Sequence, residues 1–259
     1  MGTKAIDPQS IRNVTVVGDP DETGRVVHHL LRRSGKPRTS TEPVIHWAPG
    51  RAEHTIRVAE LSSRAPLAEL EREIRVADGL VFVVHAGRRG GPRLETLLRV
   101  ADDHQVARLC LITGLDDPGA DFDRCVRTIA ETRGATPLPL QIPIGSGAAF
   151  GGVIDLVQIL ALQPLAAELY GPHWHLAENR YRALVDTVLD HPVPGPHPGE
   201  LPLNQFHHRV RRRTRIGDLV PILCSAAPKS NDTAPLLDAM VRYLPSPLDV
   251  CQPEHALDY

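Results

Sequence analysis

Short apolar runs alternate with amphipathic segments along most of this chain. Apolar runs rich in β-branched residues predict buried strands at 11–18, 79–86, 107–113, 138–144 and 218–224. Apolar residues three and four positions apart predict helices at 26–33, 67–76, 94–104, 122–133 and 236–243. Strands that alternate with helices in this way predict an α/β fold with a mostly parallel sheet and helices on both faces.

The remaining segments predict connections and one insertion. Residues 19–25 predict a polar turn, residues 34–53 a loop, and residues 54–61 an edge strand. Residues 163–216 break the α/β pattern and predict a small inserted helical subdomain. This subdomain would contain a helix at 177–189, a loop at 191–199 and a basic helix at 203–214. The predicted organisation is therefore a core of 1–162 and 217–250, the insertion 163–216, and a tail 251–259.

Composition excludes several classes of protein. The chain has 259 residues, 42% hydrophobic and 23% charged, which suits a globular domain with a real core. No apolar run is long enough for a membrane span, and the N-terminus has no signal-peptide pattern, so we expect a cytoplasmic protein. Four cysteines without C-x-x-C spacing predict neither structural zinc nor a disulfide framework.

Charge and aromatic content bear on partners. The net charge is −2 and aromatic residues make up 4% of the chain, so neither DNA nor single-stranded nucleic acid is the expected ligand. One basic cluster follows a pair of histidines, and it predicts a solvated helix face or a contact surface for RNA or an acidic partner. Its members are Arg209, Arg211, Arg212, Arg213 and Arg215.

Several stretches resemble the G domain, the first domain of bacterial elongation factor G. Ile74-Arg-Val-Ala-Asp-Gly79 is similar to the family's LRVLDG. Other similar stretches, in the family's order, are 11–17, 118–122, 139–145 and 237–250. The resemblance implies a P-loop-type α/β fold that carries a small subdomain before its last strand. It also implies that the family's later domains, which reach the ribosomal decoding site, are missing here.

The phosphate-binding loop of that family has changed. The family's A-H-x-D-x-G-K-T stands here as Gly18-Asp-Pro-Asp-Glu-Thr-Gly-Arg25. The lysine position is Gly24 and the position of the magnesium-binding hydroxyl is Arg25. Asp19, Asp21 and Glu22 would place negative charges around a triphosphate, and like charges about 5 Å apart cost roughly 3 kcal/mol each at an effective dielectric of 20. The sequence therefore predicts weak or absent binding of GTP with magnesium.

The hydrolytic motifs have changed as well. The family's D-T-P-G-H, which positions magnesium, the γ-phosphate and the attacking water, reads Glu60-Leu-Ser-Ser-Arg64 here. The first switch sequence R-G-I-T has no counterpart between Lys36 and His54. Hydrolysis by the family mechanism should therefore be lost.

The base-recognition motif is partly retained. The family's N-K-x-D reads Thr113-Gly-Leu-Asp116, in which Asp116 could still accept hydrogen bonds from guanine. The later G-[ST]-A-F reads Ser225-Ala-Ala-Pro228, whose backbone N–H groups could still contact the base. The resemblance thus gives these nucleotide-pocket equivalents: Gly18, Asp21, Thr23, Gly24, Arg25, Thr113, Asp116, Ser225 and Ala226.

Three functions remain open. The first is a stand-alone pseudo-GTPase that acts through a protein partner or the ribosome. The second is an enzyme that reuses the old pocket for acid–base chemistry on a small molecule, with candidate residues Asp19, Asp21, Glu22, Glu60, Arg64 and Asp116. The third is a GTP- or GDP-binding protein with an atypical loop. A pocket filled by its own side chains favours the first, an open pocket with clustered carboxylates favours the second, and stabilisation by nucleotide favours the third. No other cofactor and no metal site is predicted.

Overall fold

The computed structural model describes residues 7–33, 43–88, 92–131, 136–162, 165–189, 201–227 and 230–250. Seven strands form one sheet in the order β2-β3-β1-β4-β5-β9-β6. All neighbouring pairs are parallel except β2 with β3. The strands are β1 (Ile11–Gly18), β2 (Val44–Trp47), β3 (His54–Ser62), β4 (Gly79–His85), β5 (Arg108–Thr113), β6 (Thr136–Pro139) and β9 (Leu219–Cys224). The predicted α/β fold is confirmed.

The centre of the sheet is the core of the molecule. All residues of β5 and β9 are buried, as are the first six of β4. Strands covered on both faces need continuous apolar runs, which is the pattern that marks these segments in the sequence. The carboxyl ends of these three strands lie at one edge of the sheet, because the strands are parallel neighbours.

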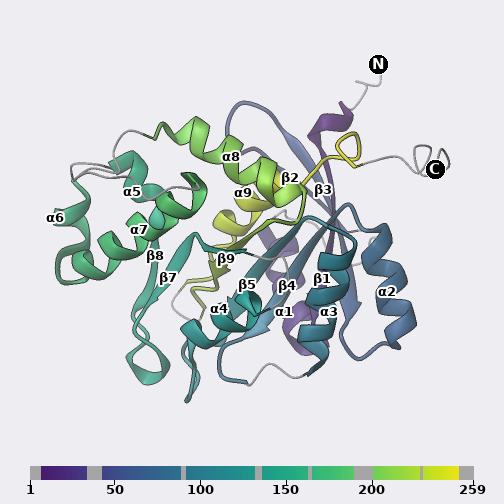
Figure 1. Ribbon diagram of the computed structural model, residues 1–259, viewed down its shortest axis with the longest axis horizontal. Coiled ribbons are helices and arrows are strands. Elements are labelled where there is room, and N and C mark those ends of the chain that lie inside the picture. Colours follow the sequence, from purple (N-terminus) through teal and green to yellow (C-terminus); the bar gives the residue numbers. More distant parts are fainter. Residues whose placement is uncertain are drawn as a thin grey trace.

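Helices cover both faces of the sheet. α2 (Leu67–Val76), α3 (Pro92–Asp103) and α4 (Phe122–Ala130) lie in front of it in Figure 1, and α1 (Pro20–Arg33) lies behind it. α1 packs on β1, β3 and β4, and α9 (Ala234–Tyr243) packs on β1 and β5. Within the described part of the chain, no helix is both long and apolar enough to cross a membrane.

A second group of helices lies to one side of the sheet, beside a two-stranded ribbon of β7 (Gln141–Ile144) and β8 (Gly152–Asp155) (Figure 1). It contains α5 (Leu156–Leu162), α6 (Ala166–Tyr170), α7 (Trp174–Leu189) and α8 (Leu203–Arg215). α7 packs on α5, α6 and α8, and α8 packs on α9 and β9. The helix expected at 177–189 begins at Trp174, whereas the loop expected at 191–199 lies outside the described residues.

The predicted polar turn at 19–25 is wrong. Helix α1 begins at Pro20, so only Asp19 separates it from β1. Proline suits the first helical position because its missing N–H would have no helical partner there. The acidic residues Asp21 and Glu22 in the first turn stabilise the positive end of the helix dipole. These local preferences lengthen the helix by six residues at its N-terminus.

Two strand predictions are also corrected. Strand β2 lies inside the segment predicted as a loop, and it covers β3, which is therefore not the edge strand. The single strand predicted at 138–144 is two strands, β6 in the large sheet and β7 in the ribbon. Pro137 and Pro139 lie in β6, an edge strand, where a residue without an N–H is tolerated. The chain leaves the large sheet after Pro139, and β7 pairs with β8.

Candidate functional site

A cavity of about 750 Å³ opens at the carboxyl ends of the central strands. His85 at the end of β4, Thr113 at the end of β5 and Cys224 at the end of β9 line it. Residues of α1 close one side, and Asp155 and Tyr170 from β8 and α6 contribute to another. Ligands of open α/β sheets bind at this edge, so the cavity is the candidate functional site.

Glu22 is the most buried acid of the cavity, with only 5% of its side chain exposed. Its Oε2 accepts a hydrogen bond of 3.0 Å from the Thr113 hydroxyl. Its Oε1 accepts one from Arg25, three residues later on the same helix. The carboxylate is held from two elements, α1 and β5, and lines the cavity beside the first turn of α1.

His85 is fixed between two carboxylates. The Gly87 N–H donates to its Nδ1 at 3.2 Å, so the neutral ring carries its proton on Nε2. Nε2 lies 3.2 Å from Asp117 Oδ2 and 3.7 Å from Glu22 Oε1. The ring also covers Gly114, where an added Cβ would lie 2.4 Å from two ring atoms. The lysine of the family motif is therefore incompatible with His85 in this position.

The backbone at the start of α1 is engaged within the helix. The N–H groups of Glu22 and Thr23 donate to the Asp19 carbonyl at 3.0 and 2.9 Å, and the Asp21 N–H donates to the Asp19 carboxylate at 3.1 Å. From Gly24 onward, helical geometry pairs each N–H with the carbonyl four residues earlier. A phosphate-binding loop needs such N–H groups aimed outward at the ligand.

Asp19 does not line the cavity and binds arginines. Arg64 Nη2 donates to its Oδ2 at 2.9 Å, and Arg88 lies 3.8 Å from the same atom. Burial alone would raise the pKa of Asp19, but the bonds from Arg64 and the Asp21 N–H, with the charges of Arg64 and Arg88, bring it below its usual value. Asp19 therefore stays ionised at neutral pH.

The predicted site residues fall into two groups. The cavity is lined by Glu22, Arg25, Thr113, Asp116, Ser225 and Ala226. The residues that do not line it are Gly18, Asp19, Asp21, Thr23, Gly24, Glu60 and Arg64. Glu60 is exposed, and its Oε2 would lie 3.9 Å from a Cβ added at Gly24. Of the five acids among the candidate catalytic residues, Glu22 and Asp116 therefore share the cavity, whereas Asp19, Asp21 and Glu60 lie outside its lining.

Sequence reasoning missed the other polar residues of the cavity, among them His85, Asp117, Gln141, Asp155 and Tyr170. A signal existed for His85, which is the first polar residue after a run of apolar ones in β4. Asp117 directly follows the recognised motif. Gln141 and Asp155 gave no local signal, because the pairing of β7 with β8 brings them together.

Asp155 and Cys224 sit on the far side of the cavity. Burial raises the pKa of Asp155, although hydrogen bonds from the Gln158 and Val157 N–H groups and from Gln141 oppose this. Burial also raises the pKa of the Cys224 thiol well above its usual value, so this cysteine is not a nucleophile at neutral pH. Among the described residues, no group of three or more His, Cys, Asp or Glu side chains is arranged to hold a metal ion.

Carboxylates dominate the charge of the cavity. Glu22, Asp116, Asp117, Asp155 and Asp232 line it, against Arg25 and Arg88. Arg25 binds Glu22, and Arg88 lies close to Asp19. Such a surface repels a triphosphate and favours a neutral or cationic ligand.

The mostly parallel sheet with helices on both faces defines an α/β domain of the P-loop GTPase-like fold class. Residues 67–246 match the family model of the elongation factor Tu GTP-binding domain, more than half of the chain. The chain therefore belongs to the elongation factor Tu GTP-binding domain family. It is 33% identical over 214 residues to an elongation factor G of Fervidobacterium nodosum. That match covers 76% of this chain but only 30% of the relative, so the chain spans about a third of that protein's length.

A solved structure shares the fold. The crystal structure of a protein from Thermus thermophilus superposes with a TM-score of 0.68 at 17% identity. The superposition covers 93% of this chain and 41% of the other. At this identity the likeness establishes the fold alone.

Proposed function

We propose that this chain is a pseudo-GTPase related to elongation factor G. In this proposal it binds guanine nucleotide weakly or not at all, does not hydrolyse GTP, and acts in the cytoplasm through contacts with a protein partner or the ribosome. In this proposal the chain retains the fold and core of a GTPase domain, and its function depends on contacts made by its surface.

The start of helix α1 carries this proposal. The segment that would cradle phosphates in the family is helical from Pro20, and the N–H groups of Glu22 and Thr23 bond to Asp19. The same turn points the Glu22 carboxylate into the cavity. A triphosphate would therefore meet a buried carboxylate where it needs outward N–H groups and a lysine.

The changed motifs give independent support. Arg64, which stands where the family places its catalytic histidine, binds Asp19 in a hydrogen bond of 2.9 Å. The family match begins at residue 67, beyond the equivalents of the phosphate loop and of D-T-P-G-H. Both segments needed for hydrolysis lie outside the residues that the family model matches.

Thermal unfolding with GTP, GDP or a non-hydrolysable GTP analogue, each with and without magnesium, tests the proposal. We expect no shift in melting temperature. A ligand at 100 times its dissociation constant adds about 2.7 kcal/mol, which corresponds to a shift of several degrees. A shift of that size with guanine nucleotides but not ATP, lost in Asp116→Ala, would overturn the proposal in favour of an atypical GTP-binding protein.

The open part of the cavity supports a second candidate, an enzyme or receptor for a neutral or cationic small molecule. His85, Asp117 and Glu22 form a connected set of proton donors and acceptors in a cavity of about 750 Å³, a size typical of small-molecule sites. A thermal-shift screen of amines, polyols and amino acids tests it. Hits that bind the wild type and Asp103→Asn, an exposed control on α3, but not Asp117→Asn support this candidate. A screen without such hits contradicts it.

A further inference from the structure

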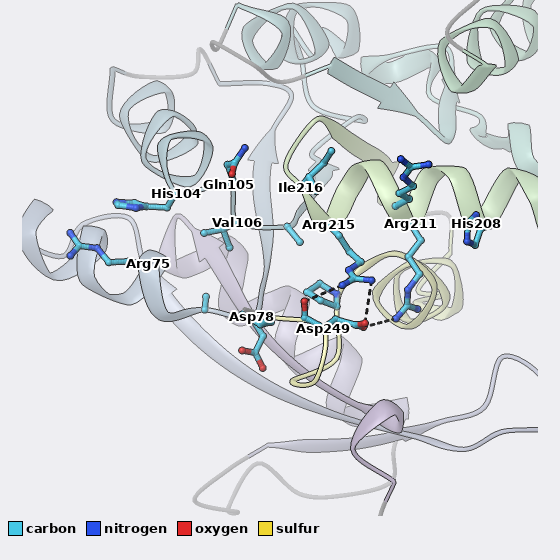
Figure 2. A pocket seen from close by; sticks show the side chains of 15 residues that line it. Arg75, Asp78, His104, Gln105, Val106, His208, Arg211, Arg215, Ile216 and Asp249 are labelled. Carbon is cyan, nitrogen blue, oxygen red and sulfur yellow. Dashed lines mark hydrogen bonds and ion pairs between the residues drawn. The ribbon is translucent and has the colours of Figure 1, made fainter. Parts of the chain in front are cut away.

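A second cavity of about 770 Å³ lies at the opposite edge of the sheet, near the amino ends of β4 and β5. Figure 2 shows its two walls: Arg75 and His104 lie near the ends of α2 and α3, and Arg211 and His208 lie on α8. Asp249, from the segment after α9, lies between them. We call this cavity the arginine cleft. It shares no lining residue with the candidate nucleotide cavity.

Positive charge prevails in the arginine cleft. Four arginines line it, Arg75, Arg211, Arg212 and Arg215, against two acids, Asp78 and Asp249. Arg75 and Arg212 are exposed, whereas Arg211 is half-buried. Asp78 accepts a hydrogen bond of 2.7 Å from Asn13 and so faces a neutral partner.

The cleft already holds a carboxylate, presented by the turn that follows α9, in which the Asp249 N–H donates to the Ser246 carbonyl at 2.8 Å. Arg211 Nη2 donates to Asp249 Oδ2 at 3.0 Å, and Arg215 Nη1 lies 3.2 Å from Oδ1 (Figure 2). Arg215 also donates to the Asp249 carbonyl at 3.0 Å. These arginines thus bind both a side-chain carboxylate and the peptide backbone that carries it. This is the chemistry with which the cleft would recognise an acidic peptide.

The rest of the lining distinguishes a peptide from other polyanions. Ile216 is 57% exposed and half-buried Ala77 also lines the cleft, together with the largely buried Val106, Ala107 and Pro245. A peptide can cover this surface with aliphatic side chains, whereas phosphates and riboses cannot. No Phe, Tyr or Trp side chain lines the described cleft, so the only rings on which a nucleic-acid base could stack there are the imidazoles of His104 and His208.

We propose that the arginine cleft is a docking surface for an acidic peptide segment of a partner protein, one that combines Asp or Glu with aliphatic residues. This docking proposal rests on the pseudo-GTPase proposal, because it names the surface and the class of partner through which the domain would act. The exposed Arg75 and Arg212 would bind the acidic side chains, and the apolar lining would bind the aliphatic ones.

Fluorescence polarisation with a short labelled peptide of Glu, Leu and Ser tests the proposal. The same peptide with Gln in place of Glu serves as the neutral probe. We expect the acidic peptide to bind the wild type, to weaken as salt is raised, and to bind at least about tenfold more tightly than the neutral peptide. The double variant R75Q/R212Q should lose about tenfold or more in affinity.

Matched controls come from the same two helices. Arg72 on α2 and Arg209 on α8 are exposed but do not line the cleft, so R72Q/R209Q should bind like the wild type. Asp249→Asn should bind the acidic peptide more tightly, because the arginine pair loses its internal carboxylate. Equal melting temperatures for both double variants would show that the fold is intact.

Three results would overturn the proposal: no binding of the acidic peptide, equal losses in the two double variants, or displacement of the peptide by lower concentrations of single-stranded RNA. The last result would assign the cleft to nucleic acid. The nucleotide titrations described above report on the other cavity. If the acidic peptide does not bind, the docking proposal fails but the pseudo-GTPase proposal does not. If a guanine nucleotide binds, the pseudo-GTPase proposal fails, but the peptide experiment still decides whether the cleft binds an acidic peptide.

Discussion

The imidazole of His85 lies over the α-carbon of Gly114, where an added Cβ would be 2.4 Å from ring atoms Cε1 and Nε2. Gly114 also has a φ of 62°, a conformation that residues with side chains rarely adopt. The residue that replaces the family's lysine is thus coupled to a histidine on the neighbouring strand. A lysine at position 114 and His85 in its present position therefore exclude each other.

Gly114→Ala should destabilise the protein by about 2 kcal/mol or more, because the methyl group meets the His85 ring and the backbone is strained. Gly119→Ala is the matched control, since Gly119 has a φ of 80° but no atom within 4 Å of an added Cβ. It should cost less. In a double-mutant cycle measured by urea unfolding, Gly114→Ala should reduce the free energy of unfolding by less when His85 is also replaced by Ala. An unchanged penalty would refute the coupling.

Thr113→Val should destabilise the fold by about 1–3 kcal/mol. The change removes the hydroxyl that donates to the buried Glu22 carboxylate and leaves that oxygen without its donor. Thr128→Val removes a hydroxyl that donates to the Arg124 carbonyl of its own helix at 3.1 Å, and it should cost less. Chemical unfolding of both variants measures the difference, and equal losses would contradict the importance of the bond between Thr113 and Glu22.

Restoring the family's phosphate-loop residues should not restore nucleotide binding. The variant Gly24→Lys with Arg25→Thr supplies a lysine and a hydroxyl, but the N–H groups of Glu22 and Thr23 still bond to Asp19. We expect no shift in melting temperature with GTP and magnesium. A shift of several degrees would mean that side chains alone, and not the helical start of α1, prevent binding.

Asp102→Ala should destabilise the protein by about 3 kcal/mol. Arg108 is fully buried, and its Nη2 donates to Asp102 Oδ1 at 2.8 Å, so the change leaves a buried charge without its carboxylate. Asp103→Ala, at an exposed position next to it, should have little effect. Comparable losses in the two variants, measured by urea unfolding, would argue against this ion pair.

Stability should fall as the pH is lowered from 6.5 towards 4. Burial and the charge of Arg242 lower the pKa of His207 from 6.5 to about 4. In that range the unfolded chain takes up a proton that folded His207 does not, so protonation favours unfolding. The dependence should be shallower in His207→Gln, by at most about 1.4 kcal/mol per pH unit. His208→Gln, at an exposed position, should keep the wild-type slope; identical slopes in all three proteins would refute the assignment.

The sequence was sufficient for the class of fold. The buried strands β4, β5 and β9 are apolar throughout most of their length, so their positions follow from local composition. The motif changes at Gly24, Arg25 and Arg64 were equally visible, because they require only a comparison of residues in order. Prediction succeeded where a single segment carries the information.

The site depended on contacts between segments that are distant along the chain. Glu22 meets Thr113 across 91 positions, and Asp19 meets Arg64 across 45. The directions of the Asp19 and Glu22 side chains depend on where α1 begins. The polar composition of residues 19–25 predicted a turn there and gave no sign of the helix start. Asp155 enters the cavity only because β8 pairs with β7. Strand order and helix phase set these distances, and neither is encoded in the pattern of one segment, so the tertiary structure alone separates Glu22 in the cavity from Asp19 outside it.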